Sequence, residues 1–174
     1  ALVQCTGIQN EYFQHLGHIQ SIDLTGTTSI NNHALLCLKS VRVLNLARCS
    51  FITGFNKEEP YSLGCLKLDT PVYNFTGAIF SEFKNLEAVN LSFCSQINDD
   101  HLEAMAGVRY IDLSHSFGFS NKGLKNFGTA KWVNVESCSQ ISNQGIAYLN
   151  QVEFLNITRC DRVIQSPGDI FKSL

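Results

Sequence analysis

The chain has 174 residues, of which 44% are hydrophobic, and a formal net charge of −2 at neutral pH. These values fit one globular domain and lack the basic excess of a general nucleic-acid binder, so we expect no nucleic-acid partner. The sequence contains no run of about 18 apolar residues to cross a membrane and no secretory-signal pattern at its start, so we expect no membrane partner either.

A sequence unit of about 22 residues recurs along the whole chain and is clearest from Leu86 to Gly107. Apolar residues occupy its positions 1, 4, 6, 12, 17 and 20, and a small residue occupies position 9. The two-residue spacing of positions 4 and 6 predicts a strand, and the three-residue spacing of positions 17 and 20 predicts a short helix. A fixed period of this size indicates a solenoid, in which stacked units pair their strands into one parallel sheet.

The units follow one another without a spacer, so we expect a single domain. The expected ranges are a partial unit 1–18 and full units 19–40, 41–62, 63–85, 86–107, 108–129, 130–151 and 152–174. The partial unit lacks its strand start, and neither end has an evident polar cap. We therefore expect the exposed ends of the solenoid to be capped by another chain or by sequence beyond the one given.

The unit 41–62 begins with a regular strand pattern, but Lys57 and Pro60 stand where the two apolar helix residues belong. We expect no regular helix over 54–62, because both apolar anchors are missing and proline interrupts helices. In the three units from Leu86 onward the pattern is strict. There the Ser, Asn and Asp residues that follow position 12 predict helix N-caps, at 98–99, 120–121 and 142–143.

Most of the seven cysteines share one position of the unit. Position 9 is occupied by Cys5, Cys49, Cys94, Cys138 and Cys160, and by Pro71 in the unit 63–85. The sequence has no close cysteine pair of the C-x-x-C type, so we expect no metal site. We expect reduced thiols that fill a tight internal turn as small apolar groups, which is typical of a cytoplasmic or nuclear protein.

Positions 2, 3, 5, 7 and 8 are expected to point away from the core, because positions 4 and 6 point into it. Position 3 is aromatic in the last three units, and charged residues flank it. An exposed aromatic group rimmed by charge is typical of an interaction hot spot. The candidate partner-binding residues are Tyr110, Trp132, Phe154, Arg109, Lys131, His115 and Arg159. The alternative is that the three rings only pack on one another as cross-strand pairs.

Position 5 carries Asp or Asn in six of the units: Asp23, Asn45, Asn90, Asp112, Asn134 and Asn156. We favour a ladder in which these side chains bond to one another, over binding to the backbone of a partner.

The five histidines suggest no enzyme. His115 is close in sequence to Asp112 and Ser114, but three residues on one exposed strand form neither a pocket nor an oxyanion hole, so we expect no catalysis. The other histidines fall on the helix side, where we expect them to be solvated: His15, His18, His33 and His101.

Strings such as VNLSFCSQINDDHLEAM, VNVESCSQISNQGIAYL and LNLARCSFIT resemble the leucine-rich repeat family, and specifically its cysteine-containing subclass. The resemblance covers nearly the whole chain. It implies an α/β fold, namely a right-handed leucine-rich-repeat solenoid of horseshoe shape, with a parallel sheet on the concave face and short helices on the convex face.

The subclass is best known from F-box proteins, whose repeats recruit a substrate to a Skp–cullin ubiquitin ligase. The resemblance therefore implies a non-enzymatic protein–protein interaction module that recognises a ligase substrate on its concave face and needs no cofactor. The chain has no visible F-box, so a Skp–cullin partner is expected only if an F-box precedes Ala1. The alternative is a stand-alone scaffold or assembly factor that holds the subunits of a larger complex.

Overall fold

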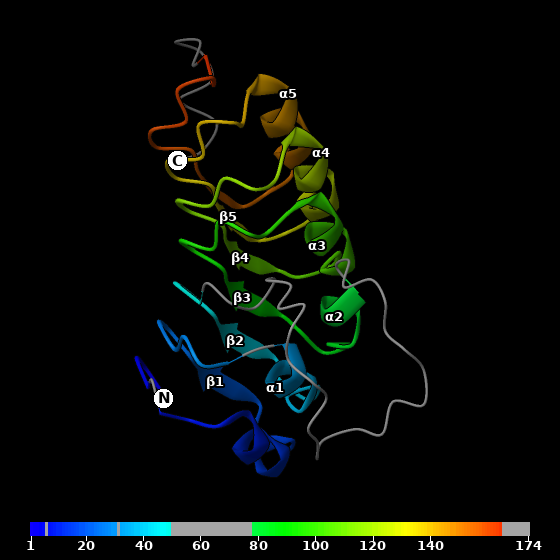
Figure 1. Cartoon of the computed structure of the whole chain (residues 1–174). Coiled ribbons are helices and arrows are strands. Elements are labelled where there is room, and N and C mark those ends of the chain that lie inside the picture. Colours follow the sequence, from blue (N-terminus) through cyan, green and yellow to red (C-terminus); the bar gives the residue numbers. More distant parts are fainter. Residues whose placement is uncertain (6, 31, 50–77, 165–174) are drawn as a thin grey trace.

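The structure, a computed structural model, describes residues 1–5, 7–30, 32–49 and 78–164. These residues form an α/β fold in which one parallel sheet carries short helices along one side (Figure 1). The six strands pair in chain order: β1 (Ser21–Asp23), β2 (Val43–Asn45), β3 (Ala88–Asn90), β4 (Tyr110–Asp112), β5 (Trp132–Asn134) and β6 (Phe154–Asn156). The coarse expectation from the sequence is thus confirmed, and the arrangement is compatible with a solenoid.

Short helices follow the strands. The described α-helices are α1 (Asn32–Leu36), α2 (Ala78–Ser81), α3 (Asp99–Ala104), α4 (Asn121–Leu124) and α5 (Asn143–Ile146). The described 3₁₀ helices are η1 (Asn10–Leu16), η2 (Lys125–Phe127) and η3 (Ala147–Leu149). Within the part of the chain that the structure describes, no helix has the length and apolar character to cross a membrane.

The core lies between the sheet and the helices. In each strand the middle residue, at position 4 of the unit, points into it, and Leu44, Ile111 and Val133 are almost fully buried there. Leu102 and Leu124 approach from the helix side and are fully buried as well. The first and last residues of the strands point the other way, so one side of the sheet is left for solvent or a partner.

The position-9 side chains cross-link neighbouring units. From Thr27 onward, each described one donates a hydrogen bond to the carbonyl of the position-6 residue in the preceding strand segment. The thiols of Cys49 and Cys138 donate to Leu24 O at 3.0 Å and to Leu113 O at 3.2 Å. Ser116 has the same role, with its hydroxyl 2.8 Å from Leu91 O. Position 9 therefore needs a small side chain with a donor, which explains why cysteine alternates there with serine and threonine.

The cysteines differ from expectation at one position. Of the described cysteines, five have free thiols, and among these only Cys5 is partly exposed. Cys37 is disulfide-bonded, so the prediction that all the cysteines are reduced is wrong for this residue.

The strand pairing also departs from the expected units at one place. The units 41–62 and 63–85 predict a strand between β2 and β3, but β2 pairs directly with β3, with Val43 opposite Ala88. Helix α2 lies between α1 and α3, in the place of the helix that belongs to β2. The described parts of 41–85 thus supply one strand and one helix, as a single unit does.

The sequence of 41–85 contains a physical reason for this departure from two regular units. Lys57 and Pro60 cannot anchor a helix, and Pro71 has no side-chain donor for the position-9 bond. Phe80 and Phe83 are buried and fill the helix positions instead. The expected irregular segment 54–62 lies outside the described residues.

Candidate interaction surface

Three aromatic residues line up at the starts of neighbouring strands. Tyr110 is paired in register with Trp132, and Trp132 with Phe154. The Trp132 and Phe154 rings stack with centroids 5.8 Å apart and planes 5° from parallel. Tyr110 is still 44% exposed and Phe154 51%. We call these three residues the aromatic row. Ring packing, the alternative interpretation, is therefore present for one pair, and it leaves much of the row open to solvent.

The two cations beside the aromatic row, Lys131 and Arg109, differ in whether they form an ion pair within the protein. Lys131 lies 3.5 Å from the carboxylate of Glu153 in a partly exposed ion pair. Arg109 is exposed and forms no ion pair with any described residue. Of the cations expected beside the rings, Arg109 is therefore the one most available to an external carboxylate.

His115 and Arg159 are separated from the aromatic row. Both lie in the turns after β4 and β6, whereas the aromatic row lies at the strand starts. Their backbones are left-handed, with φ of 56° and 58°. The turn thus carries these two side chains to the opposite end of the strands, and the expectation that they flank the rings is wrong.

The residue before position 9 has this left-handed backbone in all the described turns after strands. We call these residues the turn row: Gln4, Gly26, Arg48, Phe93, His115, Ser137 and Arg159. The N–H groups of the first six bond to the carbonyl of position 7 in the next unit, as in Arg48 N to Ser92 O at 2.9 Å and Phe93 N to Ser114 O at 2.9 Å. This regular ladder fixes the turn and aligns the side chains along one edge.

Sequence reasoning missed the aromatic residue of the turn row. Phe93 is 45% exposed and stacks on His115, with ring centroids 4.4 Å apart and planes 9° from parallel. The Arg48 guanidinium lies over the same ring, 4.6 Å from its centroid. A signal was present in the sequence, because Phe93 occupies position 8, which was expected to face outward. The structure adds that position 8 forms a row of its own.

The position-5 side chains bond mainly to their own backbone. Each accepts the N–H of the residue two places on, for example Asn90 from Ser92 at 2.9 Å. The Thr25 hydroxyl and N–H donate to Asp23 and lower the pKa of that carboxyl. Direct position-5 contacts between described units are fewer: Asn134 donates to Asp112 at 3.1 Å, and Asn45 bonds to Asp23. The predicted ladder is therefore mostly a series of local turn caps.

The residues of the rejected catalytic site do not form a relay. The Ser114 hydroxyl donates to Asp112 at 2.7 Å, and His115 is stacked on Phe93. Among the described residues, no group of three His, Cys, Asp or Glu side chains is placed to hold a metal ion.

His101 is not a surface group, contrary to expectation. It is 5% exposed, its ring lies edge-on to Phe80, and burial lowers its pKa. Its Nδ1 accepts the N–H of Asn98 at 3.2 Å, and the Asn98 side chain accepts the His101 N–H at 3.1 Å. The histidine thus completes a reciprocal cap at the start of α3.

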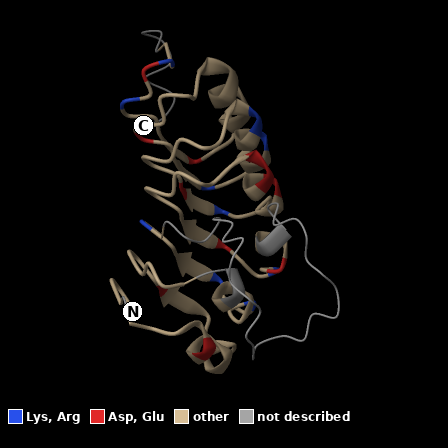
Figure 2. Ribbon diagram, viewed as in Figure 1, with Lys and Arg blue, Asp and Glu red and all other residues tan. Residues whose placement is uncertain are grey.

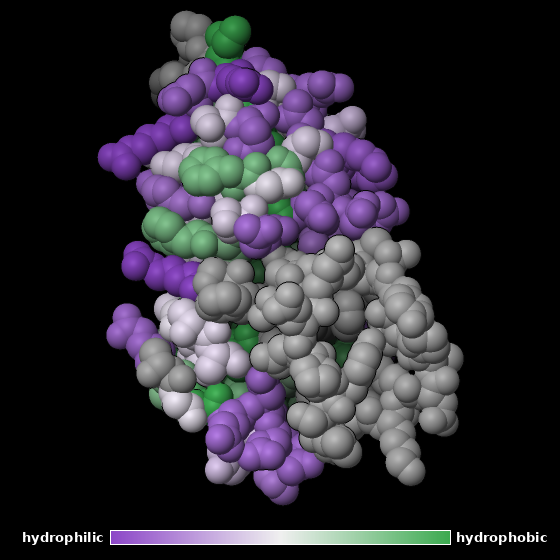
Figure 3. Space-filling view, viewed as in Figure 1, coloured by the Kyte–Doolittle hydropathy of each residue, from purple (hydrophilic) through white to green (hydrophobic). Residues whose placement is uncertain are grey.

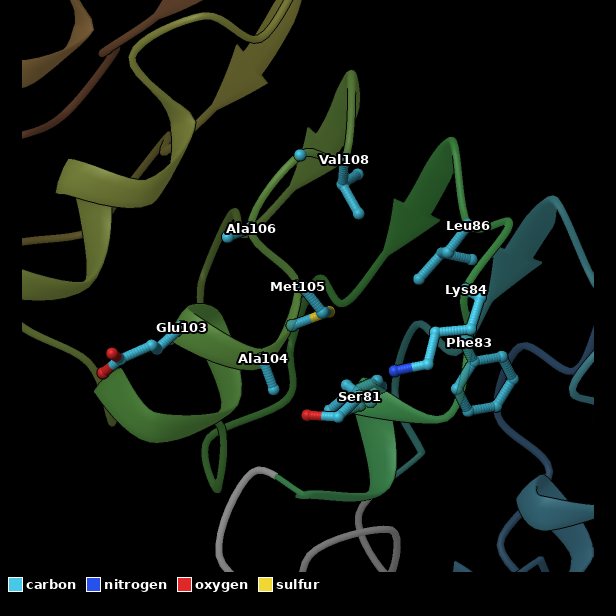
Figure 4. A pocket seen from close by; sticks show the side chains of 11 residues that line it. Ser81, Phe83, Lys84, Leu86, Glu103, Ala104, Met105, Ala106 and Val108 are labelled. Atoms are coloured by element: carbon cyan, nitrogen blue, oxygen red, sulfur yellow. The ribbon is translucent and has the colours of Figure 1, made fainter.

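An open depression of about 450 Å³ lies beside α2 and the loop that leads into β4 (Figure 4). Its apolar lining, including Leu86, Met105 and Val108, belongs to the core. Figure 4 shows Lys84 reaching along its rim, while the Glu103 carboxylate points away. One amine on the rim of an open depression, with the carboxylate turned away, offers no pairing of acid and base.

Comparison of the chain with models of known protein families finds no match, and a search among curated proteins finds none either.

Proposed function

We propose that the chain is a leucine-rich-repeat domain of horseshoe shape, which binds a protein partner on a concave face lined by the strands. Strand pairing in chain order supports this fold, as do the position-9 bonds that recur from unit to unit. Strands pair about 4.8 Å apart and helices need about 10 Å, so stacking with all the helices on one side curves the sheet towards its strand face.

The observation that carries the binding proposal is the aromatic row. Trp132 and Phe154 are already ordered by their stack, so little side-chain entropy is lost when a partner covers them. Buried aromatic anchors commonly contribute about 2 kcal/mol or more at the centre of an interface. Arg109 beside Tyr110 favours a carboxylate on the partner. An apolar segment with an acidic residue is therefore the expected ligand, and no cofactor is needed.

In this proposal the domain supplies the substrate-recognition repeats of an F-box-type ubiquitin ligase component. This role depends on the resemblance of the repeats to those of F-box proteins, and not on a feature of the proposed binding surface. A stand-alone scaffold would use the same surface, so the two roles differ in their other partners. Co-purification of the full-length protein with a Skp adaptor supports the ligase role. A full-length protein that has no F-box and binds no adaptor supports the scaffold.

The cellular compartment of the protein does not follow from the binding proposal. A cytoplasmic or nuclear location was expected from reduced thiols, and the buried free thiols fit that expectation. The Cys37 disulfide is an argument against it, because such bonds are rare in reducing compartments. Mass spectrometry of the protein taken from its native cell, without reductant, shows whether the Cys37 disulfide is present there, and so decides between a reducing and an oxidising compartment.

Replacement of one ring tests the aromatic row. Trp132→Ala is expected to weaken partner binding at least about tenfold, or 1.4 kcal/mol. Val43→Ala is the matched control, because Val43 has the same position in an earlier strand, is 44% exposed and lies outside the aromatic row. Partners are first identified as proteins captured both by the wild type and by Val43→Ala. Their affinities are then measured by calorimetry. A Trp132→Ala variant that binds normally and melts earlier would show that the ring only packs.

A further inference from the structure

The turn row carries large side chains where the backbone favours glycine. An L-residue with a left-handed backbone places its Cβ close to its own carbonyl, which costs energy that glycine avoids. The ladder of backbone bonds requires the left-handed turn but not the side chain, and Gly26 occupies one of these turns. Arg48, Phe93 and His115 are therefore not explained by the backbone alone.

These three side chains form an ordered stack at the surface. The Phe93 ring lies between the Arg48 guanidinium and the His115 ring, at 4.6 Å and 4.4 Å. Hydrophobic surface is visible along the same edge, over the loops after β3 and β4 (Figure 3), and in those loops Phe93 is 45% exposed and Phe117 53%. The stack thus holds a cation in place beside exposed aromatic surface.

The part of the turn row between β2 and β6 has an arginine at each end. Arg48 follows β2 and Arg159 follows β6, both are exposed, and neither forms an ion pair with a described residue. Figure 2 shows basic positions at the tips of these loops. Four strand spacings separate the two arginines, or about 19 Å, which an extended peptide of about six residues spans. The acidic residues nearby are Glu136, which accepts from Asn156 at 3.4 Å, and the exposed Asp161.

We propose that the turn row binds an extended acidic peptide segment that runs across the strands. Its apolar residues lie on Phe93 and Phe117, and a carboxylate at each end pairs with Arg48 and with Arg159. This surface is at the opposite end of the strands from the aromatic row and uses none of its residues. Failure of one proposal therefore does not imply failure of the other.

The probe is a fluorescent peptide of about eight residues, with glutamates at both ends and leucine and phenylalanine between them, and binding is read by fluorescence anisotropy. Phe93→Gly is expected to weaken binding at least about tenfold. Arg48→Gln and Arg159→Gln are each expected to weaken it several-fold and to reduce its dependence on salt. Because both arginines are exposed, these two variants test the proposal even if Phe93→Gly alters the fold.

Two controls separate binding from stability. Tyr148→Ala removes a ring that is 42% exposed in η3, outside both the turn row and the aromatic row, and is expected to leave binding unchanged. A peptide with lysines in place of the glutamates is expected to bind much more weakly. The proposal is overturned if the wild type does not bind the acidic peptide or if the Phe93 and arginine variants bind it normally. Tighter binding of a single-stranded RNA of similar length also overturns it.

Discussion

Burial sets the chemistry of the position-9 thiols. Desolvation is the main cause that raises the pKa of Cys94 and Cys138 to about 12, and it raises the pKa of Cys49 and Cys160 as well. The thiolate is the nucleophile, so these four side chains remain unreactive near neutral pH. Their role is the hydrogen bond that each donates to the neighbouring unit.

Alkylation of the native protein tests this assignment. Short treatment with iodoacetamide near neutral pH is expected to modify Cys5, which is partly exposed, and to spare the four buried thiols. Peptide mass spectrometry measures the modification at each position, and the denatured protein serves as the control in which all free thiols react. Rapid labelling of Cys94 in the folded protein would contradict its structural role.

The buried imidazole of His101 predicts a pH-dependent stability. Its pKa is lowered in the folded state, so below the ordinary value of about 6.5 the unfolded chain binds more protons than the folded one. The free energy of unfolding therefore falls as the pH decreases from about 6.5 towards the folded-state pKa.

Urea denaturation at about pH 7.5 and about pH 5 measures this loss. His101→Gln is the matched variant, because glutamine can accept the same N–H without titrating. It is expected to lose less stability over this range than the wild type. Asp23 and Glu82 have lowered pKa values, so their contributions are lost only at more acidic pH. Equal losses in the wild type and His101→Gln would exclude His101 as the cause.

At the scale of elements, consecutive helices are joined by side chains at their starts. The Asp99 carboxylate in α3 accepts from the N–H of Ser120 at 2.8 Å and from its hydroxyl at 2.6 Å. Asn121 makes the same link to Ser142, where its Oδ1 accepts the N–H at 3.0 Å. Gly123 leaves room for this arrangement, because a Cβ there would lie 2.6 Å from the Asp99 carboxylate.

Asp99→Ala breaks one of these links and is expected to lower the free energy of unfolding by about 1–2 kcal/mol. Asp100→Ala removes an equal charge from the same helix turn, where no hydrogen bond to α4 is present, and is expected to cost less than about 0.5 kcal/mol. Chemical denaturation compares the two variants. Equal effects would assign the loss to helix-end electrostatics instead of the link.

At the scale of the whole molecule, each described strand pairs with its neighbours in sequence order and the helices pack in the same order. Stability in such an array is the sum of the units and their nearest-neighbour interfaces. The middle strands have neighbours on both sides. At the far end, Leu155 in β6 is only partly buried, whereas Ile111 in β4 is fully buried.

Hydrogen exchange is therefore expected to be graded along the sheet. The amides of β3 and β4 should exchange at least about tenfold more slowly than those of β6. Exchange followed by mass spectrometry measures this order. Uniform protection over all the strands would mean that the domain opens only as a whole.

The sequence by itself determined the local pattern of the chain. The two-residue and three-residue spacings predicted strands and helices, and the strands stand where Val89, Ile111 and Val133 were expected to point inwards. Tyr110, Trp132 and Phe154 were correctly expected on neighbouring strands, because a regular period fixes the register. The horseshoe shape and the function remain proposals.

Only the tertiary structure decided how far the period extends and which side chains meet. The pairing of Val43 with Ala88 follows from contacts between segments far apart in sequence, which a periodic pattern counts as separate units. The burial of His101 depends on Phe80 in the preceding unit. Phe93 and His115 meet because the backbone is left-handed at position 8, after each strand. The alternation of side chains along an extended strand, which was used to place position 8, does not continue through this turn.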